Sequence, residues 1–133
     1  GKLMEHLENL AMELRVDKQV HFLGFRSDVR ELLKMADFYA HPSFREGLSV
    51  AVIEAMASGL PVICSEIRGN TDLIENGKGG FLFNPSDFEA SYMALMAMLT
   101  CTNRDLFGQY NLNKVKMFDV IRVLDVMRKV YTI

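Results

Sequence analysis

Long apolar runs and an excess of either charge are both missing from this 133-residue sequence. The longest apolar stretch, residues 48–56, contains Glu54 and falls well short of the roughly 20 residues that a membrane-spanning helix needs. The formal net charge is -2 and acidic and basic residues are interspersed, so no basic stripe could neutralise a phosphate backbone. These absences argue against a transmembrane helix and against nucleic acid as a partner.

Cysteine and proline are scarce, with two and three residues. Cys64 and Cys101 stand far apart and neither has a second ligand pair nearby, so the sequence suggests neither a zinc site nor a disulfide framework. This cysteine usage is typical of a reducing, cytoplasmic compartment. Half of the residues are hydrophobic and 24% are charged, which indicates one folded domain rather than a disordered segment.

Helical and strand patterns alternate along the chain. The leucines of residues 2–14 fall on one helical face and predict an amphipathic helix. Short apolar runs predict strands at 20–25, 37–41, 61–64 and 81–83. Further helices are expected at 27–36, 49–58, 86–99 and 120–130. Ser27 caps the first of these, Gly59 ends the second, and Ser86 with Glu89 forms a capping box at the start of the third. This order predicts an α/β fold, a Rossmann-like parallel sheet with helices on both faces.

The ligand crevice of such a sheet lies beyond the carboxyl ends of its strands, which directs attention to the residues after Phe25 and after His41. After His41, Glu46 and Gly47 precede a helix whose first free N–H groups and positive dipole end form an anion site. Glu54 lies more than a turn inside that helix. The two carboxylates therefore address different parts of one long ligand and can accept hydrogen bonds from vicinal hydroxyls, which suits a sugar nucleotide.

Glu46 and Glu54, separated by seven residues, are set in the sequence PSFREGLSVAVIEAMASGLPVI of residues 42–63. This segment resembles the donor-site signature of retaining glycosyltransferases of the GT-B fold, the glycosyl transferases group 1 family. The similarity continues through residues 65–74 and 81–83, begins earlier at residues 20–25, and covers roughly residues 1–100. It implies that residues 1–133 are an incomplete C-terminal, nucleotide-sugar-binding domain, with about two strands, a cationic arginine–lysine clamp and an acceptor-binding domain lying upstream.

The resemblance also implies roles for individual residues. Glu46 is expected to contact hydroxyls of the donor sugar and to act in catalysis, Glu54 to bind the ribose hydroxyls, and Arg26 to lie against the base. Backbone N–H groups are expected to hold the diphosphate, and they belong to Gly47, Leu48, Ser49, Val50 and Ala51. No metal and no cofactor besides the donor are expected.

Each of these residues has a simpler interpretation. Glu46 and Glu54 could be solvated surface acids, and Arg26 could pair with an acid at the start of the next helix. His41 is interpreted as a strand-end histidine satisfied by hydrogen bonds rather than as a catalytic base, and Ser49 as acting through its backbone rather than as a nucleophile.

The implied function is transfer of a hexose from a nucleoside diphosphate sugar to a hydroxyl of a glycan or lipid-linked acceptor, with retention, in bacterial surface polysaccharide synthesis. The isolated chain is expected to be inactive, and the whole protein is expected in the cytoplasm, with contact to the inner face of the membrane left open. Two alternatives remain: an epimerase or phosphorylase of the same fold, and a binding module without catalysis.

The resemblance carries one topological expectation. In the strand order 3-2-1-4-5-6, residues 20–23 would form the third strand and residues 37–41 the fourth, and the strands between them would be absent. We therefore expect residues 20–23 to pair directly with residues 37–41 or, failing that, with another chain, because exposed strand edges invite pairing.

Overall fold

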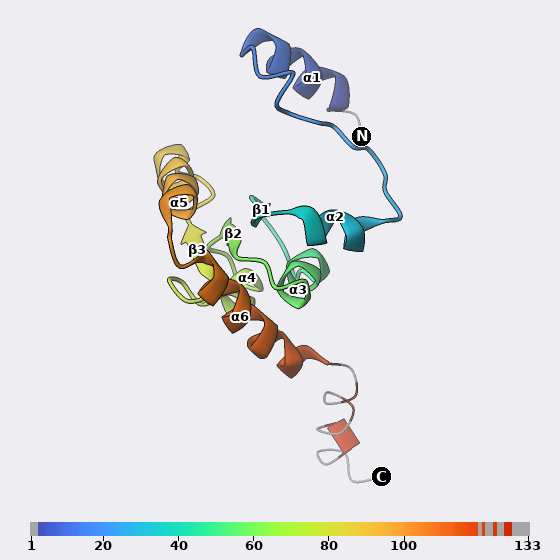
Figure 1. Ribbon diagram of the computed structural model, residues 1–133, viewed down its shortest axis with the longest axis vertical. Helices are drawn as coiled ribbons and strands as arrows, with labels where there is room; N and C mark the ends of the chain where they lie inside the picture. Colours follow the sequence, from blue (N-terminus) through green and yellow to red (C-terminus); the bar gives the residue numbers. More distant parts are fainter. Residues whose placement is uncertain (1–2, 120, 122–123, 125–126, 129–133) are drawn as a thin grey trace.

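The computed structural model describes residues 3–119, 121, 124 and 127–128 and contains a three-stranded, fully parallel sheet (Figure 1). Its order is β1 (Tyr39–His41), β2 (Val62–Ser65) and β3 (Gly80–Phe83). Tyr39 pairs with Val62, which in turn pairs with Gly80. The predicted parallel α/β sheet is confirmed, with three of the four predicted strands in place.

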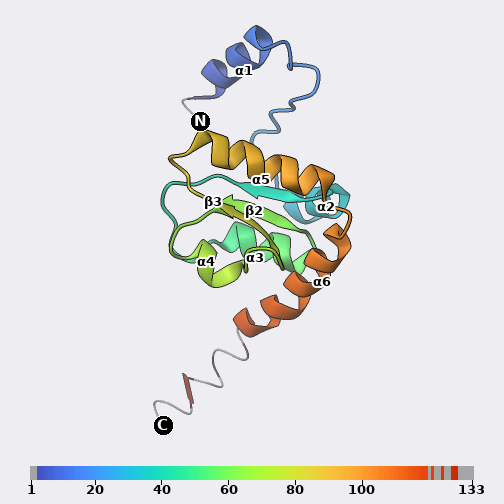
Figure 2. The same ribbon diagram turned by 90° about the vertical axis from the view of Figure 1, so that its left-hand side faces the viewer.

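Helices cover both faces of this sheet, as predicted (Figure 2). On one face lie α3 (Val50–Ala57) and α4 (Asn70–Leu73), and on the other lies α5 (Phe88–Thr100). The remaining helical elements are α1 (Met4–Glu13), α2 (Val29–Met35), α6 (Arg104–Val115) and the 3-10 turn η1 (Lys116–Phe118). No helix of the described residues is long and apolar enough to cross a membrane.

The central strand β2 divides the hydrophobic core into two halves. All four of its residues are buried, and alternate side chains point to opposite faces. Val62 and Cys64 join the cluster that contains Met56 of α3, whereas Ile63 joins the cluster that contains Met98 of α5. A short apolar run without polar alternation is thus explained by burial on both sides.

Burial also determines the chemistry of Cys64. Its side chain is fully buried, and desolvation raises the pKa of its thiol to about 12. Because the thiolate is the reactive form, we expect Cys64 to resist an aromatic disulfide reagent at pH 8 while the half-buried Cys101 reacts. Mass spectrometry of the labelled native protein checks this, with a denatured sample as the control in which both thiols react. Equal labelling of the two cysteines in the native protein would contradict the expectation.

Helix α6, which the sequence patterns did not predict, is fastened to the sheet by Asn111. The buried Nδ2 of Asn111 donates to the carbonyl of Leu60 at 2.8 Å and to that of Gly79 at 2.7 Å. Gly108 lets the helix approach closely, since a Cβ there would lie 2.1 Å from the carbonyl oxygen of Gly59. These contacts join α6 to the segments that lead into β2 and β3.

The predicted strand at residues 20–25 is wrong. These residues form no strand, and their apolar side chains are exposed, Phe25 by 97%. In both views the segment runs away from the sheet toward α1, and among the described residues β1 pairs only with β2 (Figures 1 and 2). The expected pairing with residues 37–41 is therefore not formed. An extended backbone acquires strand structure only when a neighbouring strand supplies hydrogen bonds, and none lies beside this segment.

Some predicted helix ends also differ. The N-cap position of α2 is Asp28 rather than Ser27, and that of α5 is Asp87, whose side chain accepts from the Ala90 N–H, rather than Ser86 with Glu89. The leucine face of α1 forms as predicted but is exposed. The predicted helix at 120–130 rests on five apolar residues, of which Leu124 and Met127 are described and helical, whereas Val120, Val123 and Val130 lie outside the described residues.

Candidate functional site

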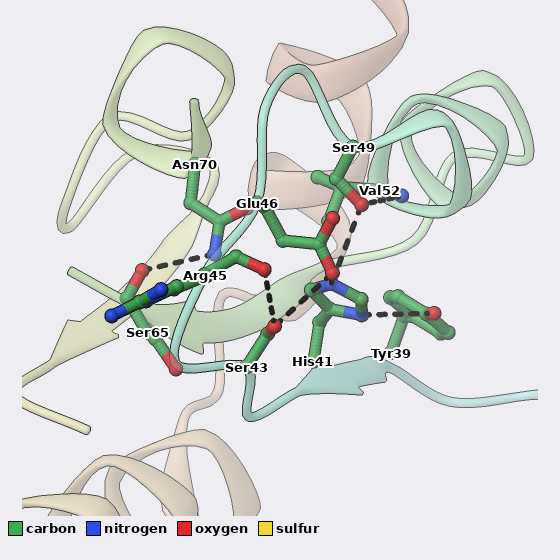
Figure 3. A network of polar contacts seen from close by, with 9 residues as sticks. All are labelled: Tyr39, His41, Ser43, Arg45, Glu46, Ser49, Val52, Ser65 and Asn70. Atoms are coloured by element: carbon green, nitrogen blue, oxygen red, sulfur yellow. Dashed lines mark hydrogen bonds and ion pairs between the residues drawn. The ribbon is translucent and has the colours of Figure 1, made fainter. Parts of the chain in front are cut away.

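The loop between β1 and α3 places Glu46 at the carboxyl edge of the sheet, where the sequence predicted a site (Figure 3). Its carboxylate is held from the strand side. Oε1 lies 3.1 Å from Nε2 of His41 and accepts from Oγ of Ser43 at 3.1 Å. Ser43 Oγ is also 3.1 Å from the carbonyl oxygen of Arg45. Glu46 is thus a fixed acceptor rather than a freely solvated acid.

His41 connects Glu46 to the sheet and to the next helix. Its Nδ1 lies 3.4 Å from the hydroxyl of Tyr39, on which its ring stacks, and its Nε2 lies 3.3 Å from Oγ of Ser49. With its hydrogen on Nε2, the ring shares that one donor between Glu46 Oε1 and Ser49 Oγ, and Nδ1 accepts from the hydroxyl of Tyr39. This geometry agrees with the interpretation of His41 as a satisfied strand-end histidine.

Ser49 caps α3, and the backbone N–H groups around it remain free. Its buried Oγ accepts from the N–H of Val52 at 3.4 Å. In the part of the chain that the structure describes, the five backbone N–H groups of residues 47–51 have no hydrogen-bond partner. Five consecutive free donors at the positive end of a helix dipole form an anion-binding arrangement. The sequence predicted an anion site at these positions.

A cleft of about 400 Å³ opens beside this loop. Glu46, Gly47 and Leu48 line one side, and residues that follow β2 line the other, namely Arg68 and Gly69 of the turn and Asp72 of α4. Sequence reasoning assigned no site role to these three residues. The signal that could have found them is topological, because they follow β2 just as Glu46 follows β1, and the carboxyl ends of neighbouring parallel strands share one edge.

Glu54 faces a different hollow, of about 160 Å³, between α2 and α3. Its other lining residues are Val29, Arg30, Leu33 and Ala57. Both carboxylates influence Tyr39. Burial raises the pKa of its hydroxyl most, and the negative charges of Glu54 and, to a smaller extent, Glu46 raise this pKa further. Glu46 and Glu54 therefore line two different hollows, and their assignment to separate parts of one ligand stays a prediction.

The structure does not bring Arg26 to either hollow. Its guanidinium makes a two-fold ion pair with the carboxylate of Asp28, the residue before α2. This hydrogen-bonded pair holds the pKa of Asp28 below its ordinary value. This arrangement agrees with the simpler interpretation of Arg26, in which it pairs with an acid at the start of the next helix. Among the described residues, no three His, Cys, Asp or Glu side chains gather so that they could hold a metal ion.

Comparison with known proteins identifies what shares this architecture. The model of the family described as glycosyl transferases group 1 matches residues 1–113. An Escherichia coli protein, UDP-Gal:alpha-D-GlcNAc-diphosphoundecaprenol alpha-1,3-galactosyltransferase, is 32% identical over 133 residues, covering 98% of this chain and 34% of its own.

Two solved structures are similar as well. HepE from Anabaena in complex with UDP-glucose is 25% identical with a TM-score of 0.83, covering 97% of this chain and 36% of that one. WaaG, a glycosyltransferase involved in lipopolysaccharide biosynthesis, is 28% identical with a TM-score of 0.78, covering 87% of this chain and 32% of that one. The chain thus spans about a third of the length of these proteins.

Proposed function

The chain belongs to the glycosyl transferases group 1 family, and from this premise we propose that the whole protein transfers a hexose from a nucleoside diphosphate sugar to a hydroxyl acceptor with retention at the anomeric carbon. Residues 1–133 serve as the donor-binding domain. The protein works in the cytoplasm, at the inner face of the membrane where a lipid-linked acceptor is exposed.

The observation that carries this proposal is the row of five free N–H groups at residues 47–51 beside the fixed carboxylate of Glu46. Cleavage of the glycosidic bond leaves negative charge on the departing diphosphate. Donors that are already aimed at the place where this charge develops stabilise the transition state without reorganisation. The N–H groups and the α3 dipole supply such stabilisation, and the mechanism uses no essential metal.

The two hollows divide the donor between them. Glu46 accepts hydrogen bonds from sugar hydroxyls in the cleft next to the N–H groups, and Glu54 accepts from the ribose hydroxyls in the hollow beside α2. This order along the protein matches the order sugar, diphosphate and ribose along a sugar nucleotide.

Relatives suggest the chemical class of donor and acceptor. The similar Escherichia coli enzyme is named for UDP-galactose and a diphosphoundecaprenol-linked sugar, and the similar Anabaena structure contains UDP-glucose. We therefore propose a UDP-hexose as donor and a polyprenyl-diphosphate-linked sugar as acceptor, in bacterial surface polysaccharide assembly.

The test is calorimetric titration of the full-length protein with UDP-hexoses, followed by a transfer assay on a polyprenyl-diphosphate-linked sugar. Proton NMR of the product reads the anomeric configuration. Binding with transfer and retention supports the proposal. Binding without turnover points to a binding module, and isomerisation of the donor sugar without transfer points to an epimerase.

Replacing Glu54 with alanine is expected to weaken donor binding more than it lowers turnover. The lost hydrogen bonds to a buried ligand hydroxyl are worth about 1 to 3 kcal/mol, or roughly fivefold to a hundredfold in the donor dissociation constant. Calorimetry and steady-state kinetics on the full-length protein check this. The matched control is Glu89→Ala, an exposed glutamate on α5 across the sheet. An unchanged donor constant in Glu54→Ala would remove the ribose assignment.

A further inference from the structure

Gly69 makes an unusually close backbone contact with the loop that carries Glu46. Its φ of 96° lies in the region that favours glycine, and it precedes α4. A Cβ at this position would lie 1.7 Å from the carbonyl oxygen of Gly47 and 3.4 Å from that of Glu46. No side chain fits there, so the two loops touch only because residue 69 has none.

The turn that contains Gly69 is itself fixed to the end of β2 (Figure 3). The side-chain Nδ2 of Asn70 donates to the carbonyl of Ser65 at 3.0 Å, and the backbone N–H of Ile67 donates to the same carbonyl at 2.9 Å. Ser65 and Asn70 are both fully buried. Gly69 is therefore a surface of fixed position rather than part of an adaptable loop.

This contact determines where one of the free donors points. The carbonyl of Gly47 is directed at Gly69, and in a trans peptide the N–H of the next residue points the opposite way. The orientation of the Leu48 N–H therefore depends on how closely the Gly47 carbonyl approaches residue 69. His41 and Ser43 hold the Glu46 carboxylate from the other side of the same loop.

We infer that Gly69 is a positioning residue of the donor site: its bare backbone seats the Gly47–Leu48 peptide and so aims the Leu48 N–H at the diphosphate and keeps Glu46 at the sugar. The inference rests on the proposed function, because it assigns Gly69 a part in the same donor site. It adds a residue from a different strand end, one that acts through the Gly47–Leu48 peptide.

The test compares Gly69→Ala with Gly77→Ala in the full-length protein. Gly77 also has a positive φ, 78°, but an added Cβ there meets nothing within 4 Å, so Gly77→Ala carries backbone strain without the collision. Displacement of reacting groups by about 1 Å can cost a hundredfold. We expect the donor KM of Gly69→Ala to rise at least tenfold and its kcat to fall, while the acceptor KM and both kinetic constants of Gly77→Ala stay within about twofold of the original values.

A purely structural role for Gly69 would lower the melting temperature and the folded fraction but would leave the donor KM of the folded molecules unchanged, and that result would overturn the inference. If Gly69→Ala does not fold, Asn70→Ala provides the second variant, because it releases the turn from Ser65 while keeping the glycine. An unchanged donor KM in folded Asn70→Ala would equally overturn it. Failure of the proposed function is seen separately, as absence of UDP-hexose binding by the unaltered protein.

Discussion

Replacing Glu46 with alanine is expected to lower kcat/KM of the full-length protein by about tenfold to a hundredfold, with most of the loss in kcat. Hydrogen bonds to a charged group contribute about 1.5 to 3 kcal/mol, and each 1.4 kcal/mol corresponds to a factor of ten. The effect falls on kcat because, in our proposal, Glu46 contacts the sugar nearest the reacting carbon, and an interaction that strengthens in the transition state lowers turnover when it is removed.

Steady-state kinetics with the best UDP-hexose donor measures this effect, with Glu89→Ala as the control. The related substitution Ser43→Ala is informative, since Ser43 contacts the Glu46 carboxylate and the Arg45 carbonyl and has no part of its own in the proposed sugar contact. It should reduce kcat less than Glu46→Ala does. If Glu46→Ala left both constants within twofold for every UDP-hexose that binds, the assignment of Glu46 to the sugar would be wrong.

Replacing Asn111 with alanine is expected to destabilise the protein by about 2 to 4 kcal/mol. The substitution removes two buried hydrogen bonds. It leaves the carbonyl of Leu60 without a donor, which costs about 1 to 3 kcal/mol, whereas the carbonyl of Gly79 keeps the backbone N–H of Val62 at 3.1 Å and loses one hydrogen bond of about 1 kcal/mol. Urea and thermal unfolding of the full-length protein measure the loss. Asn113→Ala is the matched control, because Asn113 lies two residues along α6 and is exposed, and its side chain accepts a hydrogen bond from Lys116. Equal stability of the two variants would contradict the proposed fastening of α6.

Segments whose structure depends on local burial could be predicted from the sequence. The run at 61–64 is apolar without alternation because both of its faces are covered, and the structure places β2 there. Helix α3 could be bounded at both ends, since Ser49 supplies a capping hydroxyl and Gly59 adopts a φ of 77°. Both ends of α3 therefore follow from local chemistry.

Segments whose structure depends on a distant partner could not be predicted. Residues 20–25 have the composition of a strand, but composition gives no hydrogen-bond partner, and none of the described residues provides one. Helix α6 was missed for the opposite reason. It approaches the sheet through Gly108 and Asn111, a small residue and an amide, so its buried side shows little of the apolar periodicity by which helices are found.

The site divides in the same way. Glu46 and the N–H groups of residues 47–51 belong to one continuous segment and could be assigned from it. Arg68, Gly69 and Asp72 complete the cleft from beyond the next strand. Their place depends on β2 lying beside β1, and a turn of this kind carries no signal by itself.

The attachment of α6 has a consequence for how this protein can diversify. The side chain of Asn111 donates hydrogen bonds to the carbonyls of Leu60 and Gly79, which precede β2 and β3. The cleft beside Glu46 lies at the other end of the sheet, where β1 and β2 end. Stability and the proposed donor site are therefore encoded at opposite edges of one sheet. We expect substitutions in the cleft loops to leave the hydrogen bonds of Asn111 intact, and a more stable domain tolerates more of them. A double variant that combines a change at Asn111 with a change in the cleft is expected to show the two effects simply added.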